Sequence, residues 1–136
     1  MSAHRSIGGT VLAAAAVVGA ALIPATAHAG PAEPAELSVM HLSVTNQAKI
    51  TESRSTLLTC GPAGGTHANA AQACAALDEA AGNFQDLQAQ STQCPLIYEP
   101  VTVTAKGTWK NAPVEFTHEF ANSCVLAAQT EGVYDF

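Results

Sequence analysis

The sequence predicts a single α+β domain, and three observations lead to that prediction. Short segments in which apolar and polar residues alternate recur from residue 37 onward, and alternation is the period of a β-strand. One segment between them has the period of an amphipathic helix. The four cysteines all lie from position 60 onward, and an even number is typical of a disulfide-bonded exported domain. The length of 136 residues fits one ordinary domain.

The charge balance excludes one broad class of function. Lys and Arg number 5 against 11 Asp and Glu, which leaves a net charge of −6. A nucleic-acid partner is not expected, because binding to phosphates needs a basic surface. Apolar residues make up 48% of the chain and charged residues 12%, so an intrinsically disordered chain is not expected either.

Residues 1–29 have the pattern of a secretory signal peptide. Arg5 supplies a positive charge near the start, and the uncharged run 7–23 is rich in Ala, Val, Leu and Gly. Ala27-His28-Ala29 has the small-x-small pattern that signal peptidase accepts, so we expect cleavage after Ala29. The alternative is a membrane anchor, which needs about 20 strongly apolar residues. We therefore expect a secreted, extracellular protein without a membrane association after cleavage.

The first half of the mature chain is expected to hold a tail and two strands. Residues 30–36 include two prolines and no apolar period, which indicates a flexible N-terminal tail. Alternation over 37–44 and the Thr- and Leu-rich segment 54–60 predict strands. The glycine-rich segment 61–65 predicts a turn. A phosphate-binding loop is the alternative there, but the Gly-Lys-Ser/Thr ending of such loops is missing.

An amphipathic helix is expected next, with Thr66 as its N-terminal cap. Apolar residues with helical spacing fall on one face, and Gln and acidic residues fall on the other. Gly82 is a point where this helix is expected to bend or break. The apolar face consists of Ala70, Ala73, Cys74, Leu77, Ala80, Ala81, Phe84 and Leu87.

The C-terminal half predicts a long antiparallel hairpin. Val101, Val103 and Ala105 alternate with threonines before a turn at 106–111. After the turn, apolar and aromatic residues alternate with Glu115, Thr117 and Glu119; they are Val114, Phe116, His118 and Phe120. Residues 133–136 predict a last short strand.

The four cysteines are expected to form two disulfides in an oxidising compartment. Cys74 lies on the inner face of the helix, which favours a bond to Cys60 at the end of the preceding strand. Cys94 and Cys124 are each fifteen residues from Trp109, so pairing of the hairpin brings them together at its open end. A zinc site is the alternative, but zinc ligands usually come in pairs two to four residues apart. The closest cysteines here are fourteen apart, so neither a metal nor another cofactor is expected.

The segment Cys94-Pro95-Leu96-Ile97-Tyr98-Glu99-Pro100 is the candidate functional site. Each proline fixes its own backbone and pushes the preceding residue into an extended conformation. The disulfide expected at Cys94 would hold one end of the segment. Large apolar residues on such a loop are either folded inward as core or presented to a partner. The residue pattern alone leaves both alternatives open.

The chain resembles the subtilisin-inhibitor-like family, the secreted Streptomyces subtilisin inhibitors. The resemblance extends over nearly all of residues 37–136, and all four cysteines and the proline-flanked loop occur in order. The matching segments are Leu57-Leu58-Thr59-Cys60-Gly61-Pro62, Gly64-Gly65-Thr66-His67, Ala73-Cys74-Ala75-Ala76-Leu77, Cys94-Pro95-Leu96-Ile97-Tyr98-Glu99-Pro100-Val101, Gly107-Thr108-Trp109, Phe120-Ala121-Asn122-Ser123-Cys124 and Val133-Tyr134-Asp135-Phe136. Two positions depart from the family pattern: Ala68 replaces a usual proline, and Glu99 replaces a usual aspartate.

The resemblance implies a fold, an assembly and a function. The fold would be a five-stranded antiparallel sheet with two helices packed on it, and the protein a homodimer formed through its sheet. Residues 37–136 would be a domain that inhibits subtilisin-like serine proteases, and chymotrypsin-like proteases also suit an apolar specificity residue. The mechanism would be substrate-like, with Leu96–Ile97 as the reactive bond. The rest of the reactive loop would be Gln93, Cys94, Pro95, Tyr98, Glu99 and Pro100.

Two other classes of function remain as alternatives. An enzyme is not expected, because no nucleophile motif or paired metal-ligand motif accompanies His41, His67 and His118. His118 shares a face with Phe116 and Phe120, which indicates a packed or interface histidine, and His67 is expected to make a local hydrogen bond. The second alternative is a secreted ligand-binding or cell-surface module, in which Leu96 and Ile97 belong to the core.

Overall fold

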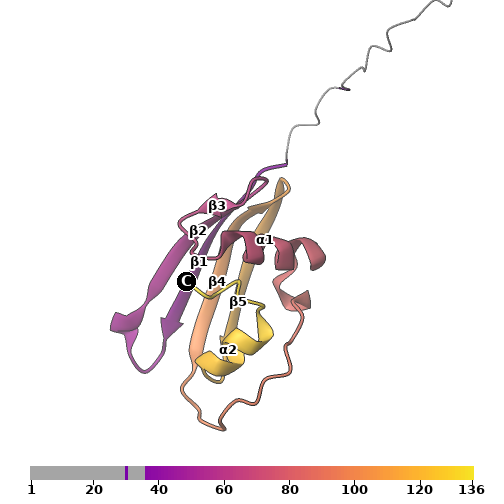
Figure 1. Ribbon diagram of the computed structural model, residues 1–136. Helices are drawn as coiled ribbons and strands as arrows, with labels where there is room; N and C mark the ends of the chain where they lie inside the picture. Colours follow the sequence, from indigo (N-terminus) through magenta and orange to yellow (C-terminus); the bar gives the residue numbers. More distant parts are fainter. Residues whose placement is uncertain (1–29, 31–35) are drawn as a thin grey trace, which may run out of the picture. The chain divides into compact units, whose positions relative to one another are not determined.

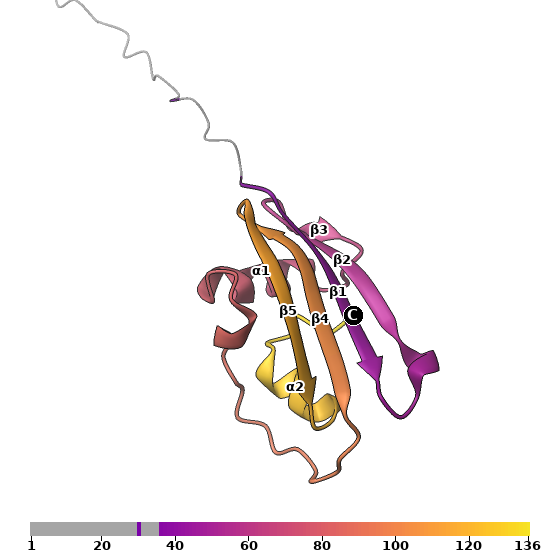
Figure 2. The same cartoon turned by 180° about the vertical axis from the view of Figure 1, so that it is seen from behind.

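The computed structural model describes Gly30 and residues 36–136. The expected signal peptide and most of the expected tail therefore lie outside the described residues. The described chain forms a five-stranded antiparallel sheet in the order β3-β2-β1-β4-β5. Both helices lie on one face of this sheet (Figure 1), and the view from behind shows the strands uncovered (Figure 2). The predicted fold class, with two helices and two disulfides, is confirmed.

The strand β1 (Ser38–Asn46) is the centre of the sheet, because it pairs with both β2 (Arg54–Cys60) and β4 (Val101–Trp109). Beyond β4, the predicted hairpin continues into the edge strand β5 (Ala112–Phe120). Lys110 and Asn111 connect these two strands, and both have positive φ, which suits the two-residue turn of a hairpin. Val103 lies opposite His118, so the hairpin is centred between Lys110 and Asn111, just beyond Trp109, and residues 106–109 of the predicted turn belong to β4.

The core lies between the inner face of the sheet and the helix α1 (Ala70–Glu79). Inward residues of the three central strands and of α1 are inaccessible to solvent; the largest are Met40, Leu42, Leu58, Leu77 and Val103. The helix is held to β2 by the Cys60–Cys74 disulfide, as the inward position of Cys74 predicts. Its apolar face and this covalent bond together fix α1 on the sheet.

The helix is shorter at both ends than its pattern predicts. Thr66 does not cap it: its hydroxyl accepts a hydrogen bond from Leu57 N at 2.9 Å, and the helix begins at Ala70. The helix ends at Glu79, and a 3₁₀ turn, η2 (Phe84–Asp86), carries the rest of the apolar stripe. Gly82, where a break is expected, has positive φ and lies so close to the Trp109 indole that a Cβ there would collide with it. Only glycine suits both conditions.

The fifth strand is not the one that the sequence predicts. Residues 133–136 form no strand; Val133 and Tyr134 follow a turn and pack into the core. The segment predicted as a simple turn supplies the short strand β3 (Gly64–Gly65), which pairs with Leu58 and Thr59. The prediction of a C-terminal strand is therefore wrong.

The second helix, α2 (Ser123–Gln129), was implied by the family resemblance and not by an amphipathic pattern. The Asn122 side chain begins it by accepting a hydrogen bond from Val125 N at 2.9 Å. Thr130 ends it, and the Thr130 hydroxyl donates to Leu126 O at 2.8 Å. With only seven residues and two fully buried side chains, α2 is too short to show a clear helical period.

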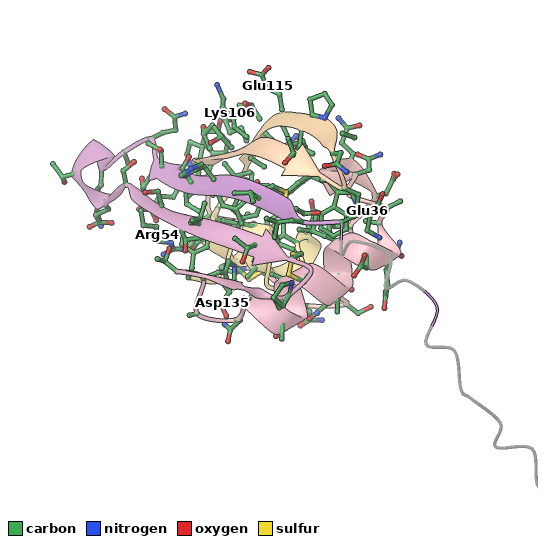
Figure 3. The ribbon with its side chains drawn as sticks, turned by 90° about the horizontal axis from the view of Figure 1, so that it is seen from above. Glu36, Arg54, Lys106, Glu115 and Asp135 are labelled. Carbon is green, nitrogen blue, oxygen red and sulfur yellow. A yellow bond between two sulfur atoms is a disulfide. The ribbon has the colours of Figure 1, made fainter. Side chains whose placement is uncertain are left out.

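The opposite face of the sheet carries mostly polar side chains. Ser43 and Thr104 hydroxyls lie 2.7 Å apart on neighbouring strands. Lys106 and Glu115, labelled in Figure 3, form an exposed ion pair of 3.4 Å across β4 and β5. A further short 3₁₀ helix, η1 (Ile50–Glu52), lies in the connection between β1 and β2. This outer face is left without a helix among the described residues.

Candidate functional site

The proline-flanked loop presents its apolar residues to solvent. Leu96 has an exposed fraction of 106%, Ile97 of 59% and Tyr98 of 74%, whereas the buried core residues are below 10%. The loop runs between η2 and β4, past α2 at the lower end of the sheet (Figure 1). The alternative in which Leu96 and Ile97 form core is therefore wrong.

One end of the loop is fixed covalently. The disulfide Cys94–Cys124 joins the residue before Pro95 to the first turn of α2, with Cα atoms 5.7 Å apart. At the other end, Pro100 O accepts a hydrogen bond from Gln47 N at 3.0 Å, and β4 begins at the next residue. The loop is thus tied down at both ends, as the cysteine and proline positions predict.

Asn122 supports the middle of the loop from beneath. Its Nδ2 donates to the backbone oxygens of Ile97 at 2.8 Å and Pro95 at 3.3 Å, one on each side of Leu96. The side chain is buried, and its Oδ1 is occupied by Val125 N, so the amide has one orientation that satisfies both ends. A single side chain therefore holds the backbone on both sides of the Leu96–Ile97 bond.

Two further bonds hold the half of the loop that follows Ile97. The backbone N–H of Glu99 donates to Ala121 O at 2.9 Å. The Tyr98 hydroxyl donates to Glu119 Oε1 at 3.1 Å. Apart from the bond from Gln47 to Pro100, the supports of the loop come from one short stretch, residues 119–124, where β5 ends and α2 begins. The loop together with Ala121, Asn122 and Val125 lines an open hollow of about 420 Å³.

Sequence reasoning missed Asn122 and Glu119 as parts of this site. The signal that could have found Asn122 is its position two residues before Cys124, which the predicted disulfide places beside the loop. Nothing in the sequence indicates that Glu119 meets Tyr98, because the two residues are 21 positions apart and both are exposed.

Comparison with known proteins agrees with this geometry. Residues 35–122 match the family model described as subtilisin inhibitor-like. The chain belongs to the subtilisin inhibitor-like family. This is a family of protease inhibitors and not of enzymes.

Relatives and a solved structure of this inhibitor family match most of the chain. A subtilase-type protease inhibitor from Streptomyces fradiae is 34% identical over 140 residues, covering 98% of this chain and 97% of that protein. A subtilase-type protease inhibitor from Streptomyces coelicolor is 38% identical, covering 83% of this chain and 80% of that protein. Streptomyces caespitosus sermetstatin, solved in complex with Bacillus licheniformis subtilisin, superposes with a TM-score of 0.59 at 33% identity; the match covers 74% of this chain and 99% of sermetstatin.

The two residues expected to depart from the family pattern, Ala68 and Glu99, are both exposed. Ala68 is exposed in the turn before α1, and Asn69, not Ala68, precedes the helix directly. Glu99 is exposed, and the hydrogen bond that it contributes to the loop comes from its backbone, which any residue except proline can supply.

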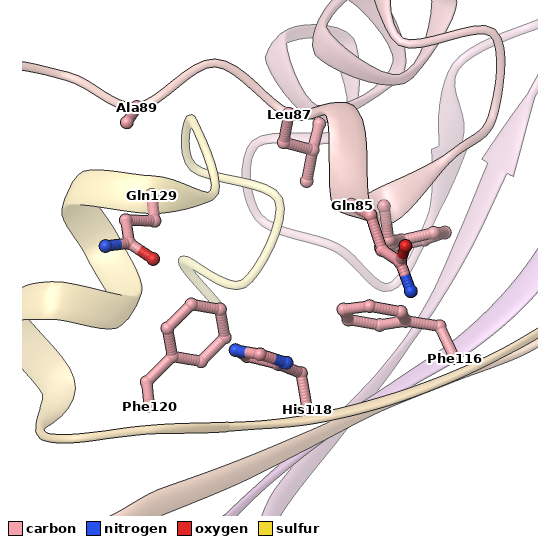
Figure 4. Close-up of a pocket in the computed structure, with 8 residues that line it drawn as sticks. Gln85, Leu87, Ala89, Phe116, His118, Phe120 and Gln129 are labelled. Atoms are coloured by element: carbon pink, nitrogen blue, oxygen red, sulfur yellow. The ribbon is translucent and has the colours of Figure 1, made fainter.

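The three histidines of the described residues have structural or surface positions. His67 is buried; its Nδ1 accepts from Asn69 N at 3.0 Å, as a local bond predicts, and its Nε2 lies 2.9 Å from Val133 O. His41 is exposed on β1. His118 is exposed and lies between the Phe116 and Phe120 rings in a pocket of about 330 Å³ (Figure 4).

Neither a metal cluster nor a membrane-crossing helix occurs in the part of the chain that the structure describes. Within residues 36–136, His, Cys, Asp and Glu side chains form no group of three placed to hold a metal ion. The helices of the same region lack the length and apolar character needed to span a bilayer.

Proposed function

We propose that this protein inhibits subtilisin-like serine proteases by a substrate-like mechanism in which Leu96–Ile97 is the reactive bond. The observation that carries the proposal is the full exposure of Leu96 at the centre of a loop that is held at both ends. The reactive loop comprises Gln93, Cys94, Pro95, Tyr98, Glu99 and Pro100 around that bond.

The loop would bind as an extended strand in the protease cleft. Backbone pairing supplies affinity, and a pocket for the Leu96 side chain supplies specificity. Because the loop is already ordered, binding avoids the entropic cost that a flexible peptide substrate pays. A leucine suits the apolar pockets of subtilisin-like and chymotrypsin-like proteases, whereas trypsin-like proteases require a cation.

After cleavage of the Leu96–Ile97 bond, the two new chain ends would leave the protease slowly. The new carboxyl end stays attached through the Cys94–Cys124 disulfide and the bond from Asn122 to Pro95 O. The new amino end stays attached through the bonds from Asn122 to Ile97 O and from Glu99 N to Ala121 O. Holding both ends in place gives them a high effective concentration, which favours religation.

Titration of subtilisin with the purified mature protein tests this function. Protease activity should fall linearly and vanish at one inhibitor chain per protease molecule. Activity that persists at micromolar excess of the protein would reject inhibition of subtilisin and favour the alternative of a secreted ligand-binding module.

Secretion is part of the proposal and follows from the signal-peptide pattern and the two disulfides, which persist in oxidising compartments. The protein recovered from culture medium should begin near Gly30. An N-terminus at Met1 on the recovered protein would contradict this.

The proposal also includes a homodimer formed through the outer face of the sheet. This face lacks a covering helix in the described region and carries Val39 and Leu57, which are only partly buried. Sedimentation equilibrium should give twice the chain mass, and a monomer at micromolar concentration would rule the dimer out.

Asn122 offers a test of how the loop is supported. Asn122→Asp keeps an oxygen that can accept from Val125 N, but it replaces the amide donor that holds Pro95 O and Ile97 O. Two lost hydrogen bonds should weaken inhibition of subtilisin about 5- to 100-fold and speed hydrolysis of the Leu96–Ile97 bond.

The matched variant is Asn122→Ala, which removes the helix cap as well. It should weaken inhibition similarly and also lower the free energy of unfolding by about 0.5–2 kcal/mol. Wild-type inhibition and wild-type hydrolysis rates in Asn122→Asp would show that the amide does not support the reactive loop.

A further inference from the structure

Tyr98 has an exposed fraction of 74%, yet a hydrogen bond restricts its side chain. Its hydroxyl donates to Glu119 Oε1 at 3.1 Å. Glu119 lies near the end of β5, on the outer face of the sheet and opposite Thr102 of β4. The acceptor therefore comes from a strand that pairing with β4 holds in place, whereas the donor comes from the loop.

Tyr98 also lies where a protease would meet it. In an extended segment, residues two apart project to the same side, and Leu96 and Tyr98 are both more exposed than Ile97 between them. A substrate-like loop that fills a protease pocket with Leu96 would place Tyr98 against the part of the cleft that receives the leaving group.

An unrestrained tyrosine at this position would sample several side-chain rotamers and lose that freedom on binding. A hydrogen bond to Glu119 restricts the rotamers before the protease arrives. The carboxylate is a strong acceptor, because hydrogen bonds to charged groups are about twice as strong as neutral ones.

We propose that Glu119 is a positioning residue of the inhibitory surface, which holds the Tyr98 side chain ready to contact the leaving-group side of the protease cleft. This inference rests on the proposed function. It adds a residue of β5, outside the loop, to those that set affinity and specificity.

The contact has a signature in the free protein. Hydrogen bonding to Glu119 and the negative charge of Glu119 both raise the pKa of Tyr98 above its usual value, because ionised Tyr98 would lose the bond and face a second anion. The chain holds two tyrosines, and burial of the other, Tyr134, raises its pKa further. Ultraviolet titration therefore resolves Tyr98 as the first tyrosine to ionise.

The test compares Tyr98→Phe, Glu119→Ala and the double variant by their inhibition constants against subtilisin. Each single change should weaken inhibition about three- to tenfold. The double variant should inhibit as well as the poorer inhibitor of the two single variants, because the two residues act through one shared contact. Glu119→Gln keeps an acceptor oxygen, so this variant should inhibit subtilisin nearly as well as the wild type.

The matched control is Glu79→Ala, which removes the same charge from an exposed position on α1, on the other face of the sheet. It should leave both inhibition and the Tyr98 titration unchanged. Glu119→Ala should move the ionisation of Tyr98 to lower pH.

The possible results separate this inference from the proposed function. If wild-type protein fails to inhibit subtilisin, the proposed function fails, while the titration still reports on the contact. If the wild type inhibits but Tyr98→Phe and Glu119→Ala match it, or if their effects simply add, positioning by Glu119 is overturned. An unchanged Tyr98 titration in Glu119→Ala overturns the contact itself.

Discussion

Replacing Leu96 with aspartate should weaken inhibition of subtilisin about a thousandfold or more. Leu96 is the most exposed of the large apolar residues in the described chain and, on the proposed mechanism, the side chain that enters the apolar specificity pocket. A carboxylate there would have to lose its hydration without an ionic partner, which is far costlier than losing apolar contact alone. The measurement is the inhibition constant from steady-state assays at several inhibitor concentrations.

Two matched variants separate specificity from folding. Leu96→Met keeps the size and apolar character of the side chain and should remain within about tenfold of wild type. Leu96→Lys should lose subtilisin inhibition and gain inhibition of trypsin, whose pocket binds a cation. All three variants should unfold at the wild-type temperature, because Leu96 has no core contacts to lose. Unchanged subtilisin inhibition by Leu96→Asp would mean that the reactive bond lies elsewhere.

Removing the Cys94–Cys124 disulfide by the double change Cys94→Ser, Cys124→Ser should affect stability and inhibition together. The bond closes a loop with a sequence separation of 30, so it contributes about 3.7 kcal/mol on the chain-entropy model. The melting temperature should fall by roughly 10–25 °C. Below that temperature, the freed end of the reactive loop should let subtilisin cleave the variant and release it as a substrate.

The other disulfide provides the control. Cys60→Ser with Cys74→Ser opens a loop with a sequence separation of 14 and should cost about 3 kcal/mol, a similar loss of stability. This bond joins β2 to α1 and does not touch the loop, so the folded variant should inhibit subtilisin without faster cleavage. Calorimetry and gel analysis of long incubations with protease measure both effects. Equal cleavage of the two variants would show that Cys94–Cys124 has no special role in the inhibitory loop.

Strand positions and disulfide pairs were predictable, because both depend on local rules. Alternation predicts β1, β4 and β5, since each has one face on the core and one face toward solvent. The pairing of Cys94 with Cys124 is predicted from their equal distances from Trp109, a residue next to the turn of the hairpin. The strand positions and the disulfide pairs therefore do not depend on which residues pack against the sheet.

Several element boundaries were not predictable, because distant contacts decide them. Thr66 is a typical residue for a helix cap, but its hydroxyl accepts a hydrogen bond from Leu57 N of β2 instead, and the helix begins only at Ala70. Residues 133–136 are predicted as a strand, but Val133 and Tyr134 are buried in the core instead, and Val133 O lies 2.9 Å from His67 Nε2. Gly64 and Gly65 look like a turn and yet pair with β2.

For the functional site, the residue pattern predicts that Leu96 and Ile97 lie on a stiff segment between two prolines, next to a cysteine. It did not determine whether that segment faces inward or outward. The outward position of these two residues is visible only in the folded chain, where Leu126, Val133 and Tyr134 belong to the buried core and Leu96 and Ile97 do not. Glu119, near the end of β5, and Asn122, at the start of α2, then lie within hydrogen-bonding distance of the loop. Such contacts join residues more than twenty positions apart, and only the folded chain brings them together.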